Sequence, residues 1–287
     1  MIFIFTLKIQ NNSETYELTH DYKHYYVMSV SGLTPPPTTI NTTVSGIHDG
    51  SYYNSSRVQE RNIVITIGLV GDVEANRQRL YSIFPLKKEC TIFYKNQHRS
   101  LKISGFVETI EADIFTEHES VQISIICPNP YFQGLKTIKG DIKREQPAQG
   151  STNPISDVTP YGTVTVIPTC YIKNPGDVDC GCIFRFRFQK YVDFLRITSR
   201  QTLACIDLQK AKFNAGDELL INTNFGKLSI THIRSNGTKR NLMPYLTNES
   251  EWIQLIPGEN TIIFTISEGV YDKINASVEF TPLYGGV

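Results

Sequence analysis

The sequence has no net charge and no long apolar run. Its 287 residues include 28 Lys or Arg residues and 28 Asp or Glu residues, so no overall electrostatic attraction directs the chain to nucleic acid or to an anionic membrane. No apolar stretch reaches the roughly 20 residues that a membrane-spanning helix needs. The first ten residues, MIFIFTLKIQ, lack the cationic start and the small-residue cleavage site of a signal peptide. We therefore expect a soluble protein made in the cytoplasm, with a strand from Phe3 to Ile9.

The common catalytic and cofactor-binding motifs are also missing. The chain contains no GxSxG elbow, no P-loop and no dinucleotide-binding fingerprint. None of its histidines falls in an HExxH or equivalent ligand motif; they are His20, His24, His48, His98, His118 and His232. These absences argue against an enzyme, a cofactor and a resident metal.

Six cysteines are scattered among strand-like segments, at positions 90, 127, 170, 180, 182 and 205. Cys180 and Cys182 are two residues apart, so on a strand both would face the same side. A zinc site needs a second paired cluster or histidines at ligand spacing, and neither is present. We expect buried free thiols in a reducing compartment.

Residues 1–133 combine strands with one helix. Asp72 can cap a helix that runs to Ile83, in which Ala75 and Leu80 face a core at helical spacing. The polar passage Thr38–Arg57 contains SGIHDGSYYNSSR and predicts a loop or a long hairpin tip. Alternating and β-branched segments predict the strands, which are Tyr25–Ser31, Asn62–Leu69, Cys90–Tyr94, Arg99–Glu111 and Val121–Cys127.

The last of these strands stops at the turn Pro128-Asn129-Pro130. A proline has no N–H for a strand ladder, and the residue before a proline is pushed out of the helical region. The aromatic pair Tyr131-Phe132 follows at once. We therefore end the first domain at residue 133. Residues 134–161 are rich in Gly, Pro, Ser, Thr and charged residues, which predicts a linker and a lead-in strand.

Residues 162–287 form an almost wholly β segment. Turn sequences such as Asn236-Gly237 separate short strands at regular intervals, which is typical of a sandwich or jelly roll. The expected strands are Thr163–Ile167, Ile183–Phe188, Phe194–Thr198, Leu203–Asp207, Glu218–Asn222, Lys227–Ile233, Thr261–Ile266 and Ala276–Pro282. Trp252, the only tryptophan, is expected to anchor the core or its rim.

Two sets of residues allow a different function. The acidic run around Glu108 and Glu111, which continues through Asp113, Glu117 and Glu119, could supply the paired carboxylates of a glycosidase. A solvated strand edge explains the same run. In the second segment, Trp252 could stack on a sugar and amides could hydrogen-bond to it. Turn chemistry explains the same amides. The residues of this second set are Trp252, Asn222, Asn224, Arg234 and Asn236.

The order of several motifs resembles the distal tail (Dit) proteins of siphophages and related prophages. The first segment carries GLTPPP, the polar passage, NRQRLYSIFP and the closing CPNPYF. The second carries GDELLINTNFGK and then WIQLIPGEN. Together these motifs span most of the chain. The cysteine pair around Gly181 is a departure from the pattern of that family.

The resemblance implies a mainly β structural protein without a cofactor. It implies an N-terminal, β-barrel-like domain with one α-helix, followed by a C-terminal galectin-like β-sandwich. Six copies would form a baseplate-hub ring at the virion tail tip, assembled in the host cytoplasm. The ring would join the major tail tube protein to the tail-associated hub or lysin protein, and in some relatives it carries receptor-binding proteins. The alternative is a carbohydrate-binding adhesin that uses the sandwich for host-surface glycan.

Ring closure needs two different surfaces on each copy. The passage Thr38–Arg57 is the leading candidate for one of them, because adjacent tyrosines stand in a long polar segment. We therefore predict that Tyr52, Tyr53 and Arg57 contact a neighbouring copy or the tail tube.

Overall fold

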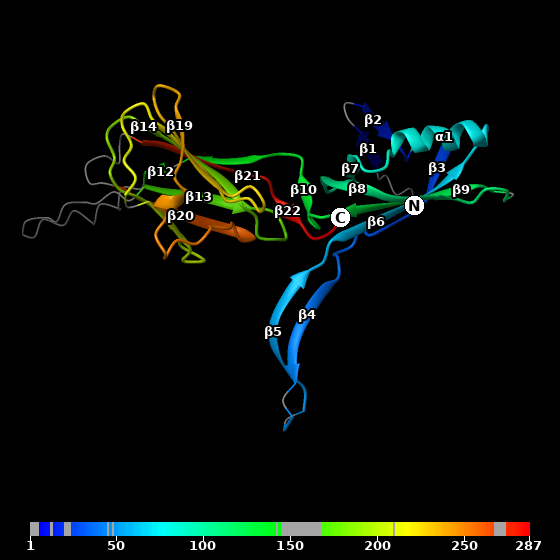
Figure 1. The fold of residues 1–287 in the computed structure, drawn as a ribbon, viewed down its shortest axis with the longest axis horizontal. Helices are drawn as coiled ribbons and strands as arrows, with labels where there is room; N and C mark the ends of the chain where they lie inside the picture. Colours follow the sequence, from blue (N-terminus) through cyan, green and yellow to red (C-terminus); the bar gives the residue numbers. More distant parts are fainter. Residues whose placement is uncertain are drawn as a thin grey trace, which may run out of the picture. The chain divides into compact units, whose positions relative to one another are not determined.

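The computed structural model describes residues 6–11, 14–19, 24–44, 46–47, 49–116, 118–141, 143–144, 168–208, 210–266 and 274–287. The protein is mainly β, as expected from the sequence (Figure 1). It divides into two compact units: unit 1 comprises residues 1–135 together with 283–287, and unit 2 comprises residues 136–282. Among the described residues, no helix has the length and apolarity to cross a membrane.

Unit 1 is built on one nine-stranded sheet. Its main path runs β2-β1-β7-β8-β9-β6-β3, and β10 joins β8 to β22. All the pairings are antiparallel, and they involve β1 (Thr6–Asn11), β2 (Glu14–Glu17), β3 (Tyr25–Ser31), β6 (Arg61–Leu69), β7 (Glu89–Lys95), β8 (Ser100–Ala112), β9 (Ser120–Cys127), β10 (Phe132–Gly134) and β22 (Leu283–Tyr284).

Alternation along these strands explains the core of unit 1. In β6 the residues Ile63, Ile65 and Ile67 are fully buried, and in β9 Val121, Ile123 and Ile125 are fully buried. Successive side chains of a strand point to opposite faces, so this spacing of two places each set on one face. The prediction of these two strands is confirmed, with boundaries one residue longer at the start of each.

The predicted helix is α1, Val73–Ile83, which follows β6 in the chain. Asp72 caps it by accepting a hydrogen bond from the backbone N–H of Ala75 at 3.1 Å. Leu80 and Ile83 are buried, as predicted. Ala75 is exposed, so the prediction that it faces the core is wrong. Arg77 is buried in its place, because two carboxylates compensate its charge.

Unit 2 contains two antiparallel sheets. The six-stranded sheet runs β11-β21-β14-β17-β18-β19, and the five-stranded sheet runs β12-β13-β20-β15-β16. The strands are β11 (Ile138–Asp141), β12 (Lys143–Arg144), β13 (Pro168–Asn174), β14 (Cys182–Phe188), β15 (Leu195–Ser199), β16 (Cys205–Asp207), β17 (Glu218–Asn222), β18 (Ser229–Ile233), β19 (Lys239–Asn241), β20 (Gly258–Ile266) and β21 (Ile274–Phe280), with a 3-10 turn η1 (Met243–Tyr245) after β19.

Aromatic side chains join the two sheets of unit 2. Phe184 and Phe186 of β14 both meet the ring of Phe264 of β20 edge-on, with centroids 6.5 and 5.6 Å apart. All three rings are buried, and edge-to-face pairs of this kind add to the burial energy. Two inner faces that interdigitate in this way are those of a β-sandwich.

Several expectations need adjustment. The expected strand Thr163–Ile167 lies outside the described residues, and β13 follows it at Pro168–Asn174. β11 and β12, in the segment expected to be a linker and a lead-in strand, pair with the sheets of unit 2. Residues 283–287, expected in the sandwich, belong to unit 1.

The cysteine prediction is confirmed. All six cysteines are free and buried. Burial raises the pKa of Cys90 to about 11 and that of Cys127 to about 12, because a thiolate loses its hydration there.

Candidate assembly interface

The passage Thr38–Arg57 folds as a long β-hairpin. β4 (Thr38–Val44) and β5 (Ser51–Val58) pair only with each other among the described strands. We call β4, β5 and the turn between them the arm. Figure 1 shows the arm reaching out from the strands of unit 1. Every residue of β4 and all but the last residue of β5 are exposed.

The sequence of the arm explains both its pairing and its exposure. β4 is rich in Thr, Ile and Val, which favour strands, and Gly50 before β5 adopts a φ of 90° that suits glycine. Polar side chains bridge the two strands: Asn41 donates to Ser55 Oγ at 3.0 Å, and Asn54 donates to Thr43 Oγ1 at 2.7 Å. These contacts stabilise the ribbon without an apolar core.

The predicted contact residues all lie on β5. Tyr52 is 61% exposed and Tyr53 is 65% exposed, and Arg57 is exposed as well. Tyr52 pairs with Thr43 and Tyr53 with Thr42. Because consecutive strand residues point to opposite faces, each face of the ribbon carries one tyrosine. An isolated two-stranded ribbon is marginally stable in water, so this arm is suited to pairing with another surface.

A buried arginine holds the base of the arm. Arg61, the first residue of β6, is 1% exposed and donates hydrogen bonds to four backbone carbonyls. Its Nη1 donates to Gly32 and to Thr34 (2.7 Å), residues that lead into β4. Its Nε donates to Pro130 at 2.7 Å and its Nη2 to Gly285 at 2.6 Å. Arg61 therefore ties together three segments that are far apart in the sequence.

The environment of Arg61 is adapted to a buried cation. Burial lowers the pKa of the guanidinium, since the charged form loses hydration. The Phe132 ring lies 4.6 Å from the guanidinium carbon and adds a cation–π contact. Gly32 has a φ of 80°, and a Cβ there would lie 2.0 Å from the carbonyl oxygen of Asn62. Only glycine fits at that point.

The C-terminal residues complete the same base. β22 pairs with β10, so Leu283 lies opposite Gln133. The backbone N–H of Val287 donates to the carbonyl of Leu33 at 3.2 Å, and Arg99 donates to the carbonyl of Gly286 at 3.0 Å. Neither this return of the chain nor the burial of Arg61 has a signal in the local sequence.

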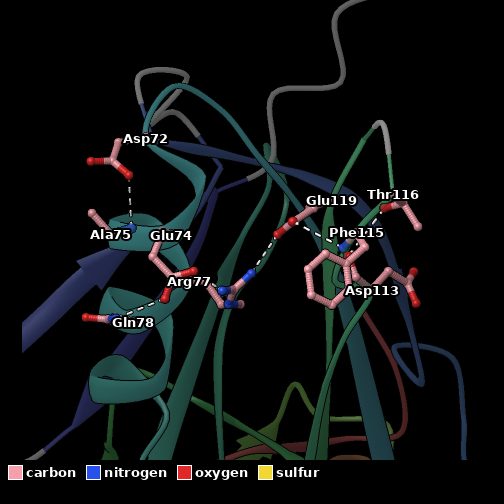
Figure 2. A network of polar contacts seen from close by, with 9 residues as sticks. All are labelled: Asp72, Glu74, Ala75, Arg77, Gln78, Asp113, Phe115, Thr116 and Glu119. Atoms are coloured by element: carbon pink, nitrogen blue, oxygen red, sulfur yellow. Dashed lines mark hydrogen bonds and ion pairs between the residues drawn. The ribbon is translucent and has the colours of Figure 1, made fainter.

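A second exposed feature of unit 1 is the turn between β8 and β9. Phe115 is 98% exposed and has a φ of 74°, a backbone conformation that is strained for a bulky side chain. Its backbone N–H points to Glu119 Oε1 at 3.5 Å. Figure 2 shows that Glu119 in turn accepts from Arg77 of α1, at 2.7 Å. The helix thus anchors the turn that presents Phe115.

The alternative sites receive little support from the geometry. In the acidic run, Glu119 pairs with Arg77, Glu108 accepts from Ser124 Oγ at 3.0 Å, and Asp113 accepts from Ser120 Oγ at 3.1 Å. These carboxylates serve as local hydrogen-bond acceptors, whereas Glu117 lies outside the described residues. Within the described part of the chain, no group of three or more His, Cys, Asp or Glu residues is placed to hold a metal ion.

The candidate sugar-binding residues do not converge. Asn222 accepts from the backbone of Asn224 in the β17–β18 turn, and Asn236 accepts from the backbone of Thr238 in the β18–β19 turn. Arg234 lies in that second turn. The two turns stand at opposite ends of β18. The asparagines therefore act as turn residues, and Trp252 is half-buried in a segment outside the named strands.

Part of the chain matches a known protein family. Residues 175–284 match the family model of the siphovirus-type tail component, C-terminal domain. The matched family is one of tail components rather than enzymes, in agreement with the expectation of a structural protein. No functionally curated protein matches the sequence.

A likeness to a solved structure covers nearly the whole chain. The crystal structure of the Dit protein of phage SPP1, a paradigm of the hub adsorption apparatus in phages that infect Gram-positive bacteria, is similar with a TM-score of 0.66. The match covers 98% of this chain and 99% of that chain at 15% identity, so it is a likeness of fold. The phage P2 baseplate in its activated conformation with Ca matches with a TM-score of 0.49 at 13% identity, over 97% of this chain and 98% of that chain.

Proposed function

We propose that this chain is a structural hub subunit of a phage or prophage tail, and that six copies form a ring. The ring would join the major tail tube protein to the tail-associated hub or lysin protein at the host-facing tip of the virion. Its action is assembly, without bond-breaking chemistry. The family match of residues 175–284 and the Dit-like fold support a tail hub role.

The arm is the observation that carries the assembly part of the proposal. It is a long ribbon with exposed tyrosines on both faces and no core of its own. Tyrosine is among the residues that contribute most to protein interfaces, because its ring buries a large area and its hydroxyl can still hydrogen-bond. In a ring, the arm of one copy would pack on a different surface of the next copy.

The decisive measurement is the mass of the assembled protein. Light scattering after size-exclusion chromatography should give six times the 32.5 kDa mass of one chain. A protein that stays monomeric at every concentration, both alone and with tail tube protein, would contradict the ring.

A variant without the arm tests the contact itself. Thr39 and Arg57 are directly opposite each other, so residues 40–56 can be replaced by Asn-Gly, a two-residue turn that preserves the register. We expect this variant, and the double variant Tyr52→Ser/Tyr53→Ser, to stay monomeric. Tyr191→Ser removes a similarly exposed tyrosine from unit 2 and should still form rings. Intact rings from the armless variant would refute the role of the arm.

A further inference from the structure

Unit 2 has a cavity of about 230 Å³ that the hub role does not use. It lies between the segment that precedes β17 and the β18–β19 hairpin with η1. The residues that line it are Lys210, Ala211, Lys212, Asn214, His232, Arg234, Arg240, Leu242 and Tyr245. Four of these nine residues carry a positive charge and none carries a negative one.

The four cations lack carboxylate partners. Among the described residues, no ion pair involves Lys210, Lys212, Arg234 or Arg240. Three other cations of unit 2 do have carboxylate partners. Lys139 pairs with Glu279, Arg187 with Glu218, and Arg196 with Asp207. The four cationic side chains are exposed, so they can reach an anion that enters the cavity.

Asp217, which contacts the lining residue His232, already has hydrogen-bond partners. His232 Nε2 lies 2.8 Å from Asp217 Oδ2, and both side chains are buried. Asp217 also accepts from the backbone N–H groups of Asn214 at 2.9 Å and Ser235 at 3.0 Å. Burial alone would raise the pKa of Asp217, but these three hydrogen bonds lower it overall. Asp217 is thus a fixed anion that orients the His232 ring at the floor.

The wall of the cavity adds further oriented donors. Arg240 donates to the Tyr245 hydroxyl and stacks over the Tyr245 ring at 4.9 Å. The His232 ring packs edge-on against Phe213, with centroids 5.2 Å apart. These contacts limit the rotamers of Arg240, Tyr245 and His232, and preorganised groups lose less entropy when they bind a ligand.

We propose that this cavity binds a phosphate group carried by a small sugar or polyol. A phosphate ester offers up to two negative charges and several acceptor oxygens to four cationic donors, and Arg forms bidentate hydrogen bonds with such groups. The cavity is smaller than the roughly 300 to 1,000 Å³ of pockets for drug-sized ligands. It therefore suits a phosphate with a short polyol rather than a long oligosaccharide. The proposal does not depend on ring formation.

Calorimetric titration with three probes tests the site on the full chain at constant ionic strength. The probes are inorganic phosphate, glycerol 3-phosphate and glucuronate. We expect saturable binding of glycerol 3-phosphate, weaker binding of inorganic phosphate, and the weakest binding of glucuronate, whose single carboxylate matches the four cations poorly.

Equal affinity for glucuronate and glycerol 3-phosphate would overturn the assignment to phosphate. Tighter binding of inorganic phosphate than of glycerol 3-phosphate would overturn the polyol part. Absence of saturable binding of both phosphates would overturn the site.

Matched variants separate the site from general surface charge. Lys212→Gln/Arg234→Gln removes two lining cations and should weaken glycerol 3-phosphate binding by roughly tenfold or more, since a hydrogen bond to a charged group contributes about that factor. Lys173→Gln/Lys227→Gln removes two exposed cations elsewhere on unit 2 and should change the affinity less than about twofold, because distant exposed charges are screened. Equal losses in both double variants would overturn the proposal.

Discussion

At the scale of single residues, Arg61 connects several segments of unit 1 that are far apart in the sequence. One guanidinium holds the lead-in to the arm, the proline turn after β9 and the C-terminal residues through backbone carbonyls. Carbonyls are dipoles, so they stabilise the cation without adding an opposite charge. Removing the guanidinium leaves four partly buried carbonyls without this donor, which is costly.

Arg61→Met should therefore destabilise unit 1 by about 3 kcal/mol. The only tryptophan lies in unit 2, so fluorescence would miss this effect, and hydrogen exchange of the β6 and β9 amides is the better measurement. Lys88→Met removes an exposed cation from the same unit and should leave exchange unchanged. Equal protection in Arg61→Met and the wild type would show that Arg61 is dispensable.

Asp217 should make the free energy of unfolding of unit 2 decrease at acidic pH. Its pKa in the folded protein lies below the ordinary value of 3.8, so its contribution is complete above that value. It is lost as the pH falls through the folded pKa.

The substitution Asp217→Asn should lower the free energy of unfolding by about 2 kcal/mol at neutral pH, and it should make the loss of stability with falling pH less steep. Urea unfolding followed by Trp252 fluorescence measures both, with the exposed Asp179→Asn as the control. An unchanged acid dependence in Asp217→Asn would argue against this linkage.

At the scale of elements, the arm differs from every other pair of strands in unit 1. The central strands β6 and β9 bury isoleucines on one face, whereas the arm buries almost nothing. Its hydrogen bonds are open to solvent, and segments of this kind open locally at little free-energy cost. The same property leaves both of its faces available for a partner.

Hydrogen exchange should therefore report on arm docking. In the monomeric Tyr52→Ser/Tyr53→Ser variant, the β4 and β5 amides should exchange at nearly unprotected rates, because a lone ribbon is marginal. In assembled wild-type protein, the same amides should become protected, while β9 amides stay protected in both. Arm amides that are as slow in the monomer as in the assembly would mean that the arm is stable by itself.

At the scale of the whole chain, the C-terminal residues return to the first unit. β22 pairs with β10, and the carbonyls of Gly285 and Gly286 accept from Arg61 and Arg99. Residues more than 180 positions apart in the sequence thus share one base. Contacts of such long range cost much loop-closure entropy before they form, so we expect them to form late in folding.

Ending the chain at Pro282 should destabilise unit 1 by about 2 kcal/mol, since the carbonyls that accept from Arg61 and Arg99 and one strand pairing are lost. Exchange of the β6 and β8 amides should quicken, while the unfolding midpoint of unit 2 measured by Trp252 fluorescence stays the same. Val287→Ala keeps the backbone hydrogen bonds and should have a smaller effect. A truncated chain with unaltered β6 and β8 protection would contradict a structural role for the return.

Local sequence patterns predicted most of the elements. The alternation of Ile63, Ile65 and Ile67 predicted a strand, and Asp72 with Leu80 and Ile83 predicted the helix, because periodicity and caps act over a few residues. The exposure of Ala75 was not predicted. Arg77 pairs with Glu119, which is 42 positions away in the sequence. Arg77 is therefore buried, whereas Ala75 is exposed.

The sequence by itself determined which strands are amphipathic, where the helix begins, that the thiols stay free, and that the common catalytic motifs are missing. These properties depend on residue types and on spacings of a few positions. Only the tertiary structure decided that the polar passage is a free-standing arm, that Arg61 is buried at its base, and that four cations surround one cavity in unit 2. Each of these results from strand order and long-range pairing, which the local periodicity of a sequence does not encode.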